Sequence, residues 1–208
     1  MLLSLNSWHV ATRFAELGLQ VVGIDYSRRS INYAQQQVTQ HDQPIEYIYR
    51  NYQELNYSNR FEAVVLIYGD FCTLTDAARD IVLSRIYEAL KPGGFFAFDV
   101  MTPVYHFRYQ ELSSWAAEKE GFWRPGPYLV LNQKFDYGEE EVYLDRHVVI
   151  EESGTVTDYR IWNRLYNLEK LQILLGKFGF EIEEKWSDLT GAPYDPNAEW
   201  LGVLARKI

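Results

Sequence analysis

The sequence predicts an α/β fold: a mostly parallel sheet with a C-terminal antiparallel hairpin and an inserted antiparallel β cap. Apolar runs of strand length alternate with amphipathic stretches of helical length up to about residue 100, which is typical of βαβ units. The run AVVLIY at 63–68 is continuously apolar, as expected for a strand buried on both faces. From about 102 to 165 the pattern changes to aromatic and alternating runs, which favour an antiparallel meander.

The first half of the chain carries clear boundary signals. Gly18 is placed to end a short helix, Ser27 to cap the next one, and Pro44 to end it. The turn Lys91-Pro92-Gly93-Gly94 is a strong stop signal. We therefore expect a helix over 9–17, a strand over 20–24, a helix over about 28–40, strands over 45–49 and 61–68, a helix from Thr75 or Asp76 to near Leu90, and a strand over 95–100.

The second half predicts an insertion followed by a return of the α/β pattern. The alternating runs cover 128–135, 142–150 and 155–162, with turns at Glu139-Glu140-Glu141 and Ser153-Gly154. Asn167 can cap a helix that ends at Gly179, and strands follow over 180–186 and 199–207. We expect one domain over 1–208, with the β-rich cap at 102–165 inside it.

Composition excludes several classes of function. The net charge of −9 and the pI near 5.0 give no basic footprint for nucleic acid. No apolar stretch approaches the roughly 18 residues of a membrane span, and Cys72 is the single cysteine. We expect a cytoplasmic protein with no membrane or nucleic-acid partner. The four histidines show no close metal-ligand spacing, so we expect no metal.

The segment Val21-Val22-Gly23-Ile24-Asp25 is the most informative motif. An apolar strand that ends in an acidic residue is typical of the second strand of a nucleotide-binding α/β sheet, where the carboxylate accepts hydrogen bonds from ribose hydroxyls. An exposed loop acid, or the cap of the next helix, is the alternative for Asp25.

Four features together resemble the class I S-adenosylmethionine-dependent methyltransferases, from about residue 9 to the C-terminus. They are the segment ending in Asp25 and followed by Ser27, the segment 50–55 after the third strand, the segment 68–71 after the fourth, and the "LKPGG" turn at 90–94. The C-terminal hairpin and the segments 188–191 and 193–195 look like those of bacterial small-molecule members. The resemblance implies S-adenosylmethionine as cofactor, S-adenosylhomocysteine as product, and a small-molecule acceptor methylated on O or N.

The resemblance also implies site residues. Asp25 and Tyr26 would bind the cofactor at the ribose, and Asn51 and Tyr52 would lie at the adenine, unless Asn51-Tyr52 only forms a turn. Tyr68, Gly69 and Phe71 would lie near the sulfonium, with core packing as the alternative for Phe71. Asp70 could orient the acceptor or act as a general base, or cap the next segment. His106, beside Tyr105 and near Trp123 at the start of the insertion, is a further candidate base, with a surface or core histidine as the alternative. Arg164 could pair a substrate carboxylate or form a structural ion pair.

The glycine-rich turn that such folds place about 20 residues before the acid does not show in this sequence. Residues 1–17 contain no glycine, and the turn would fall at Ser4-Leu5-Asn6-Ser7-Trp8. Three explanations are open: a truncated product or internal start, a relative that lost cofactor binding, or a different path of residues 1–8 that still admits the cofactor. Met1 to Leu5 would form only a stub of a central strand, which favours association, including a homodimer.

The sequence thus predicts a methyltransferase that acts on a small molecule. The methyl transfer is a displacement at carbon that depends on alignment and desolvation more than on acid or base, so no catalytic triad is expected. A non-catalytic or truncated relative that acts as a binding module is one alternative. A dehydrogenase-like nucleotide binder is another, which the Lys91–Gly94 turn and the terminal hairpin disfavour.

Overall fold

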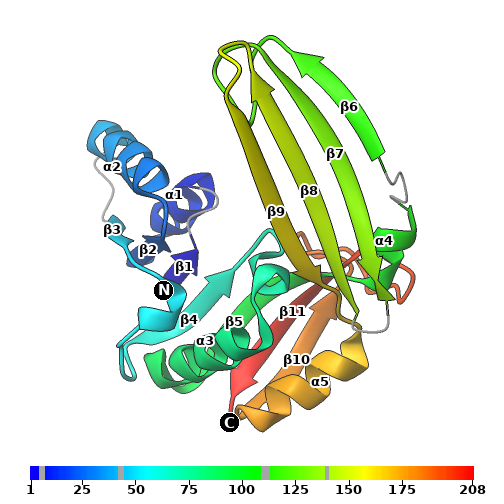
Figure 1. Ribbon diagram of the computed structural model, residues 1–208. Helices are drawn as coiled ribbons and strands as arrows, with labels where there is room; N and C mark the ends of the chain where they lie inside the picture. The colour runs from blue at the N-terminus through cyan, green and yellow to red at the C-terminus, as the bar shows by residue number, and fades with distance from the viewer. Residues whose placement is uncertain (5–7, 42–44, 109–112, 139–140) are drawn as a thin grey trace.

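A computed structural model describes residues 1–4, 8–41, 45–108, 113–138 and 141–208 (Figure 1). Seven strands of this described part form one sheet, here called the large sheet, in the order β10-β11-β5-β4-β1-β2-β3. Four further strands, in the order β6-β7-β8-β9, form the cap sheet, which stands over one end of the large sheet (Figure 1). The predicted fold class is confirmed, including the antiparallel insertion.

The large sheet is parallel apart from its C-terminal hairpin. Strand β11 runs antiparallel to both β5 and β10, while the other neighbouring pairs are parallel. Its strands are β1 Leu2–Ser4, β2 Val21–Asp25, β3 Ile45–Tyr49, β4 Phe61–Leu66, β5 Leu90–Met101, β10 Phe180–Trp186 and β11 Trp200–Lys207.

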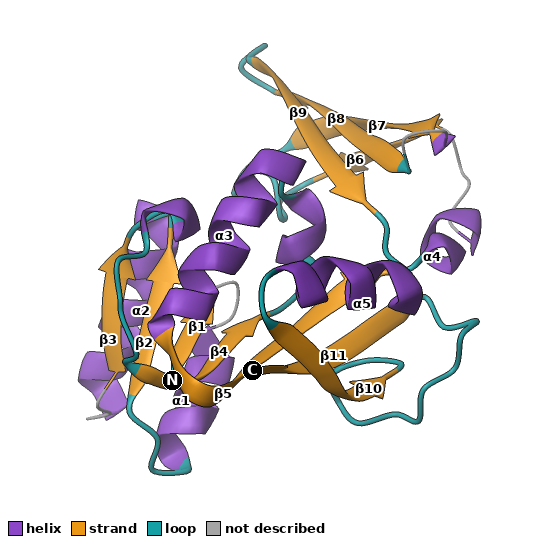
Figure 2. Cartoon of the chain, turned by 90° about the horizontal axis from the view of Figure 1, so that it is seen from below, coloured by secondary structure: helices purple, strands orange, loops and turns teal. Residues whose placement is uncertain are grey.

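Helices pack on both faces of the large sheet. Alternate residues of β4 separate into two apolar clusters, because successive side chains of a strand point to opposite faces: Val64 packs with α3 and α5, and Val65 with α1 and α2. Figure 2 shows α3 and α5 on one side of the sheet and α1 on the other. The helices are α1 Trp8–Glu16, α2 Arg28–His41, α3 Asp76–Ala89, α4 Pro103–Arg108 and α5 Leu168–Lys177, with short 3₁₀ helices η1 Tyr52–Glu54 and η2 Asp70–Thr73.

Side-chain caps begin the helices where the sequence predicts them. Oxygens of Ser27, Thr75 and Asn167 accept hydrogen bonds from backbone N–H groups three residues later, at 3.2, 3.2 and 2.9 Å. Gly18 follows α1 with φ of 82°, the left-handed conformation that commonly ends a helix. Each cap satisfies a backbone donor that the helix itself leaves without a partner.

The central strand β1 is short. Leu2 pairs with Val22 of β2 and with Val64 of β4, and Leu3 pairs with Gly23 and Val65. A cavity of about 430 Å³ lies at the amino-terminal end of β1, bounded by Met1, the Gly18–Gln20 segment and the start of β4. The glycine-rich turn is expected at Ser4 to Trp8. Its central residues, 5–7, lie outside the described residues.

The turn at Lys91–Gly94 is part of β5 rather than a loop before it. Leu90 pairs with Phe61, the register shifts, and pairing resumes at Phe95 opposite Ala63. A Cβ at Gly94 would lie 2.9 Å from the carbonyl oxygen of Lys91 and 3.1 Å from that of Glu62, so only glycine fits this bulge. The strand therefore begins about five residues earlier than the sequence predicts.

The cap sheet is an antiparallel meander of β6 Ser113–Glu118, β7 Tyr128–Tyr137, β8 Val142–Glu151 and β9 Val156–Arg164. The turn at Ser153-Gly154 is confirmed, with Gly154 at φ of 83°. The expected turn at Glu139–Glu141 includes residues 139 and 140, which lie outside the described part of the chain. Within the described residues, no helix is long and apolar enough to cross a membrane.

Candidate active site

The predicted cofactor residues lie at the carboxyl ends of the parallel strands of the large sheet, here called its carboxyl edge. Strand β2 ends at Asp25 and β4 ends just before the Tyr68–Asp70 turn, with β1 between them. Because the carboxyl ends of parallel strands share one edge, these residues lie on the side where open α/β sheets bind ligands. The cap sheet stands over the neighbouring part of that edge (Figure 1).

Asp25 is held in place by the turn that follows it. Its Oδ1 accepts a hydrogen bond of 2.7 Å from the N–H of Ser27, and its carbonyl accepts one of 3.0 Å from the N–H of Arg50. Partial burial raises the pKa of this carboxyl above its ordinary value, against the lowering effect of its backbone hydrogen bonds. A carboxylate offers about four lone-pair sites, so these contacts leave acceptor capacity for a ligand.

Tyr26 presents an aromatic face beside that carboxylate. Its ring is stacked on Tyr49 with centroids 5.2 Å apart, and 64% of the residue is exposed. The guanidinium of Arg28 lies over the Tyr49 ring, 4.3 Å from its centroid, and forms a cation–π contact with it. The stack forms a flat surface at the end of β2 and β3 that can receive a planar ring.

Asn51 and Tyr52 occupy the first turn after β3. The Asn51 Oδ1 accepts a 3.0 Å hydrogen bond from the N–H of Gln53 and caps η1. The Tyr52 hydroxyl donates a 3.1 Å hydrogen bond to Oδ2 of Asp70. The structure thus brings a residue predicted at the adenine into contact with one predicted to be catalytic.

The turn after β4 is strained and tightly supported. Tyr68 and Gly69 both have positive φ, 65° and 70°, which is unusual for a tyrosine. The N–H of Gly69 donates a 2.9 Å hydrogen bond to Oδ1 of Asp99 on β5. A Cβ at Gly69 would lie 3.3 Å from the Trp200 ring, so the ring packs against the backbone at this point.

Asp99 and Trp200 are supporting residues that the sequence analysis missed. Burial raises the pKa of the Asp99 carboxyl, although the N–H groups of Gly69 and Tyr68 act in the opposite direction. An acid inside the apolar run FAFDV is the signal that could have indicated a buried carboxylate with a fixed partner. No comparable local signal marks Trp200.

Phe71 lies in the core. It is fully buried, with its ring centroid 4.9 Å from that of Phe98 and 5.4 Å from that of Tyr166. This is the packing role that the sequence allowed as the alternative. Phe71 supports the Tyr68–Asp70 turn from below.

Two further residues predicted to be functional, His106 and Arg164, lie at or near the cap sheet. His106 lies in α4, and its side chain is outside what the structure describes, so its role as a base stays a prediction. Arg164 forms an ion pair with Asp76 at the start of α3, with Nε and Oδ1 3.0 Å apart. This contact joins the end of β9 to the start of α3 and is the structural alternative for Arg164.

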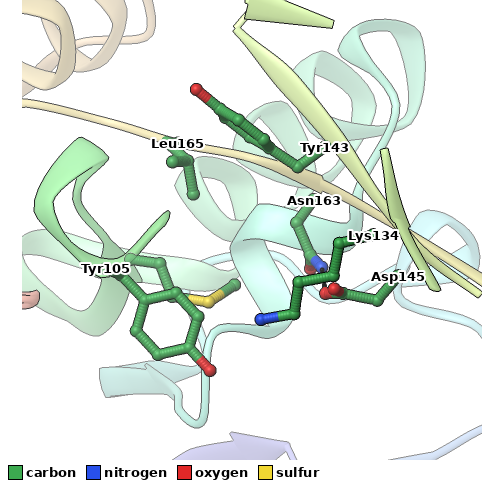
Figure 3. A pocket seen from close by; sticks show the side chains of 7 residues that line it. Tyr105, Lys134, Tyr143, Asp145, Asn163 and Leu165 are labelled. Carbon is green, nitrogen blue, oxygen red and sulfur yellow. Dashed lines mark hydrogen bonds between the residues drawn. The ribbon is translucent and has the colours of Figure 1, made fainter. Parts of the chain in front are cut away.

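A polar pocket lies where the cap sheet meets the large sheet (Figure 3). Asn163 is 7% exposed, and its Nδ2 donates a 2.9 Å hydrogen bond to Oδ2 of Asp145. The sequence analysis did not find this group, because its members lie on different strands. The pocket is lined by Met101, Tyr105, Lys134, Tyr143, Asp145, Asn163 and Leu165.

The edge of the large sheet fits the nucleoside part of S-adenosylmethionine. Asp25 offers carboxylate oxygens for ribose hydroxyls, and Tyr26 with Tyr49 offers a ring face for the adenine. Beside Tyr68 a cavity of about 420 Å³ opens between α1 and the end of β4, bounded also by Asp99. These acceptor oxygens and this ring face are of the kinds that a nucleoside can use.

Comparisons with known proteins identify the family of the chain. Residues 8–94 match the family described as "Methyltransferase domain". YqeM of Bacillus subtilis (strain 168), provisionally named a methyltransferase, is 31% identical over 214 residues, covering 99% of this chain and 82% of its own.

Solved structures share the fold. The CcbJ methyltransferase from Streptomyces caelestis superposes with a TM-score of 0.78 at 19% identity, covering 99% of this chain and 82% of its own. A Burkholderia thailandensis 1,6-didemethyltoxoflavin-N1-methyltransferase, solved with that compound and S-adenosylhomocysteine, gives 0.58 at 16% identity, covering 99% and 70%. At these identities the likeness establishes the fold alone.

The chain has the α/β fold of S-adenosylmethionine-dependent methyltransferases of solved structure. The chain belongs to the methyltransferase-domain family, to which its similarity with the Bacillus relative over nearly its whole length assigns it. Among solved structures of this fold, CalS10 from Micromonospora echinaspora was determined with S-adenosylmethionine bound and the Burkholderia enzyme with S-adenosylhomocysteine.

Proposed function

We propose that the enzyme methylates an oxygen or nitrogen atom of a small molecule bound between the carboxyl edge of the large sheet and the cap sheet. The observation that carries this proposal is the adjacency of the Tyr68–Asp70 turn and the polar pocket, which share Met101 as a wall. The N1-methyltransferase from Burkholderia thailandensis, which has the same fold, was solved with a small heterocyclic compound bound, and this supports a small acceptor.

We propose that Asp25 and the Tyr26–Tyr49 stack hold the nucleoside. When bound, S-adenosylmethionine supplies an electrophilic methyl carbon on a sulfonium. Asp25 accepts hydrogen bonds from the ribose hydroxyls, and the neighbouring ring limits movement of the adenine. Asn51 and Tyr52, at the start of η1, complete this side of the site.

The Tyr68–Asp70 turn is proposed to align the reaction. The acceptor atom attacks with its lone pair, a bond to the methyl carbon forms as the carbon–sulfur bond breaks, and the acceptor loses its proton. Asp70, which accepts a hydrogen bond from the Tyr52 hydroxyl, is the proposed acceptor of that proton, directly or through water. Most of the rate enhancement is expected from alignment and from excluding water, which the cap sheet provides.

The acceptor is expected to be neither a nucleic acid nor an anionic polymer. The chain carries a formal net charge of −9, and the pocket itself contains the aspartate Asp145. Both features disfavour a large polyanion at the site.

Calorimetry with S-adenosylhomocysteine tests this proposal. The protein should bind it with one site per chain, and radiolabelled methyl transfer to fractionated small-molecule extracts should follow. Absence of binding at millimolar S-adenosylhomocysteine would overturn the proposed function. Binding without transfer to any small-molecule fraction, but with transfer to protein or RNA, would overturn the acceptor class.

A further inference from the structure

The pocket beneath the cap sheet is built from both parts of the fold. Met101 and Tyr105 come from the end of β5 and from α4, whereas Lys134, Asp145 and Asn163 come from three neighbouring strands of the cap (Figure 3). Its volume of about 20 Å³ admits a group about as large as one water molecule. The pocket is therefore suited to one functional group of a ligand rather than to the whole molecule.

Strand register places the polar side chains on one face of the cap sheet. Lys134 lies directly opposite Asp145 across β7 and β8, and Tyr143 lies opposite Asn163 across β8 and β9. Residues opposite one another in an antiparallel pair share a face and approach closely. The four side chains therefore converge without any loop having to bring them together.

A buried amide orients the carboxylate of the pocket. Asn163 is 7% exposed, and its Nδ2 donates to Oδ2 of Asp145 at 2.9 Å. Burial of an amide and a carboxylate is costly unless their hydrogen bonds are made. The contact fixes the direction of the Asp145 carboxylate and leaves lone pairs for a ligand, because a carboxylate has about four.

The pocket adjoins the turn where methyl transfer is proposed. The Cε of Met101 lies 3.6 Å from the position of a Cβ on Gly69, and the Trp200 ring lies 3.3 Å from the same point. Tyr105 packs edge-on against Trp200, with ring centroids 5.8 Å apart. Met101 and Tyr105 thus connect the surroundings of the Gly69 turn with the pocket that contains Lys134 and Asp145.

We propose that this pocket binds a hydroxyl group of an uncharged methyl acceptor, an inference that rests on the proposed function. The Lys134 ammonium only donates hydrogen bonds, and the Asp145 carboxylate only accepts them. A hydroxyl group does both at once. Because Lys134 and Asp145 carry opposite charges, their effects on an ammonium, carboxylate or phosphate group largely offset one another, while the cost of removing that charged group from water remains. The paired charges thus select for a neutral group.

Three probes of one shape test the proposal. Benzyl alcohol, benzylamine and benzoate carry a neutral, a cationic and an anionic group on the same ring at pH 7.5. Their binding to the protein saturated with S-adenosylhomocysteine is measured by saturation-transfer NMR on the wild type, Lys134→Met and Asp145→Asn. Lys177→Met, at an exposed position on α5, is the matched control.

The proposal makes opposite predictions for the two variants. The wild type should bind benzyl alcohol at least about fivefold more tightly than either charged probe, the size of a modest electrostatic discrimination. Lys134→Met should shift the preference toward benzylamine, Asp145→Asn should shift it toward benzoate, and Lys177→Met should change neither. Equal preference in the wild type, or the same order in all variants, would overturn the hydroxyl assignment.

Calorimetry with S-adenosylhomocysteine on the same proteins separates this inference from the proposed function. Unchanged cofactor binding without the charge-dependent preference overturns the pocket alone. A wild type that fails to bind S-adenosylhomocysteine overturns the proposed function instead. Because Lys→Met and Asp→Asn nearly conserve volume, we expect both variants to fold, which the retained cofactor affinity also checks.

Discussion

The large sheet and the cap sheet differ in how far their faces are covered by other parts of the protein. The centre of the large sheet packs against helices on both sides, and Phe96, Phe98 and Val100 on β5 are fully buried. The cap sheet has a small cluster around Val149 and leaves Trp115 71% exposed. The large sheet, which holds the larger buried clusters, carries the proposed nucleoside site, whereas the more exposed cap sheet carries the proposed contacts with the acceptor.

This difference predicts where a substitution affects stability and where it affects function. Core positions of the large sheet should control folding, its carboxyl edge should control cofactor affinity, and the cap pocket should control the choice of acceptor.

Phe98→Ala should destabilise the protein by about 3–5 kcal/mol, because a fully buried ring in contact with Phe71 and Phe96 is replaced by a cavity. Val149→Ala in the cap should cost about 2 kcal/mol, because two buried carbon atoms are removed at about 0.8 kcal/mol each and leave a small cavity. Urea denaturation followed by tryptophan fluorescence measures both. A larger loss for Val149→Ala would contradict the assignment of the main core to the large sheet.

Asp25→Ala should weaken S-adenosylhomocysteine binding by about 100-fold, because hydrogen bonds to a charged group each contribute about 1.5–3 kcal/mol. Asp195→Ala is a matched control: its Oδ1 accepts from the N–H of Asn197 at 2.8 Å, the same local turn as Asp25 with Ser27 at 2.7 Å. Calorimetry should show ordinary affinity for the control. An equal loss in both variants would mean that the turn, not ligand binding, explains the effect.

Gly69→Ala should destabilise the protein by about 1–2 kcal/mol, because an alanine is strained at φ of 70° and its Cβ would crowd the Trp200 ring. Trp200→Leu should reduce the additional cost of Gly69→Ala, which a double-mutant cycle of melting measurements detects. If the stability effects of Gly69→Ala and Trp200→Leu are additive, the Trp200 ring does not restrict the turn at Gly69.

The pH dependence of cofactor binding should be the smallest effect. Ionised Asp25 is the form that accepts two ribose hydroxyls, and burial raises its pKa above the ordinary value near 4. Affinity for S-adenosylhomocysteine should therefore fall as the pH falls from 7 toward 4, starting at a higher pH than an ordinary aspartate would give. Without ligand, the effect of pH on folding stability has the opposite sign. Because the pKa of Asp25 is higher in the folded than in the unfolded protein, its protonation stabilises the fold at low pH, and this stabilisation is lost as the pH rises through the folded-state pKa.

Asp25→Asn separates this titration from that of the ligand itself. The variant should lose the component of the pH dependence that lies above the ordinary aspartate range, while any protonation of the adenine remains. Calorimetric titrations at pH 4.5, 5.5 and 7 compare the two proteins. Identical profiles would assign the dependence to another group.

Local signals in the sequence account for much of the large sheet. Ser27, Thr75 and Asn167 act as caps because their side chains satisfy nearby backbone groups, and Asp25 ends its strand as predicted. These features depend on residues a few positions apart, so one sequence suffices to predict them.

The cap and its pocket depend on pairings that no local pattern specifies. Strand β6, with the sequence SSWAAE, lacks the β-branched residues that usually mark a strand, so it was not predicted. Lys134, Asp145 and Asn163 converge only through the registers of three strands. The contact of Asp99 with Gly69 spans 30 residues and likewise has no short-range signal.

The central claim is that cofactor and acceptor are recognised by different sheets. Calorimetry with S-adenosylhomocysteine on the wild type, Asp25→Ala and Asp145→Asn tests it most directly. The account predicts that Asp145→Asn binds within about twofold of the wild type, because its position on the cap sheet should not contact the nucleoside, while Asp25→Ala loses about 100-fold. Wild-type affinity in Asp25→Ala, or a comparable loss in Asp145→Asn, would contradict it.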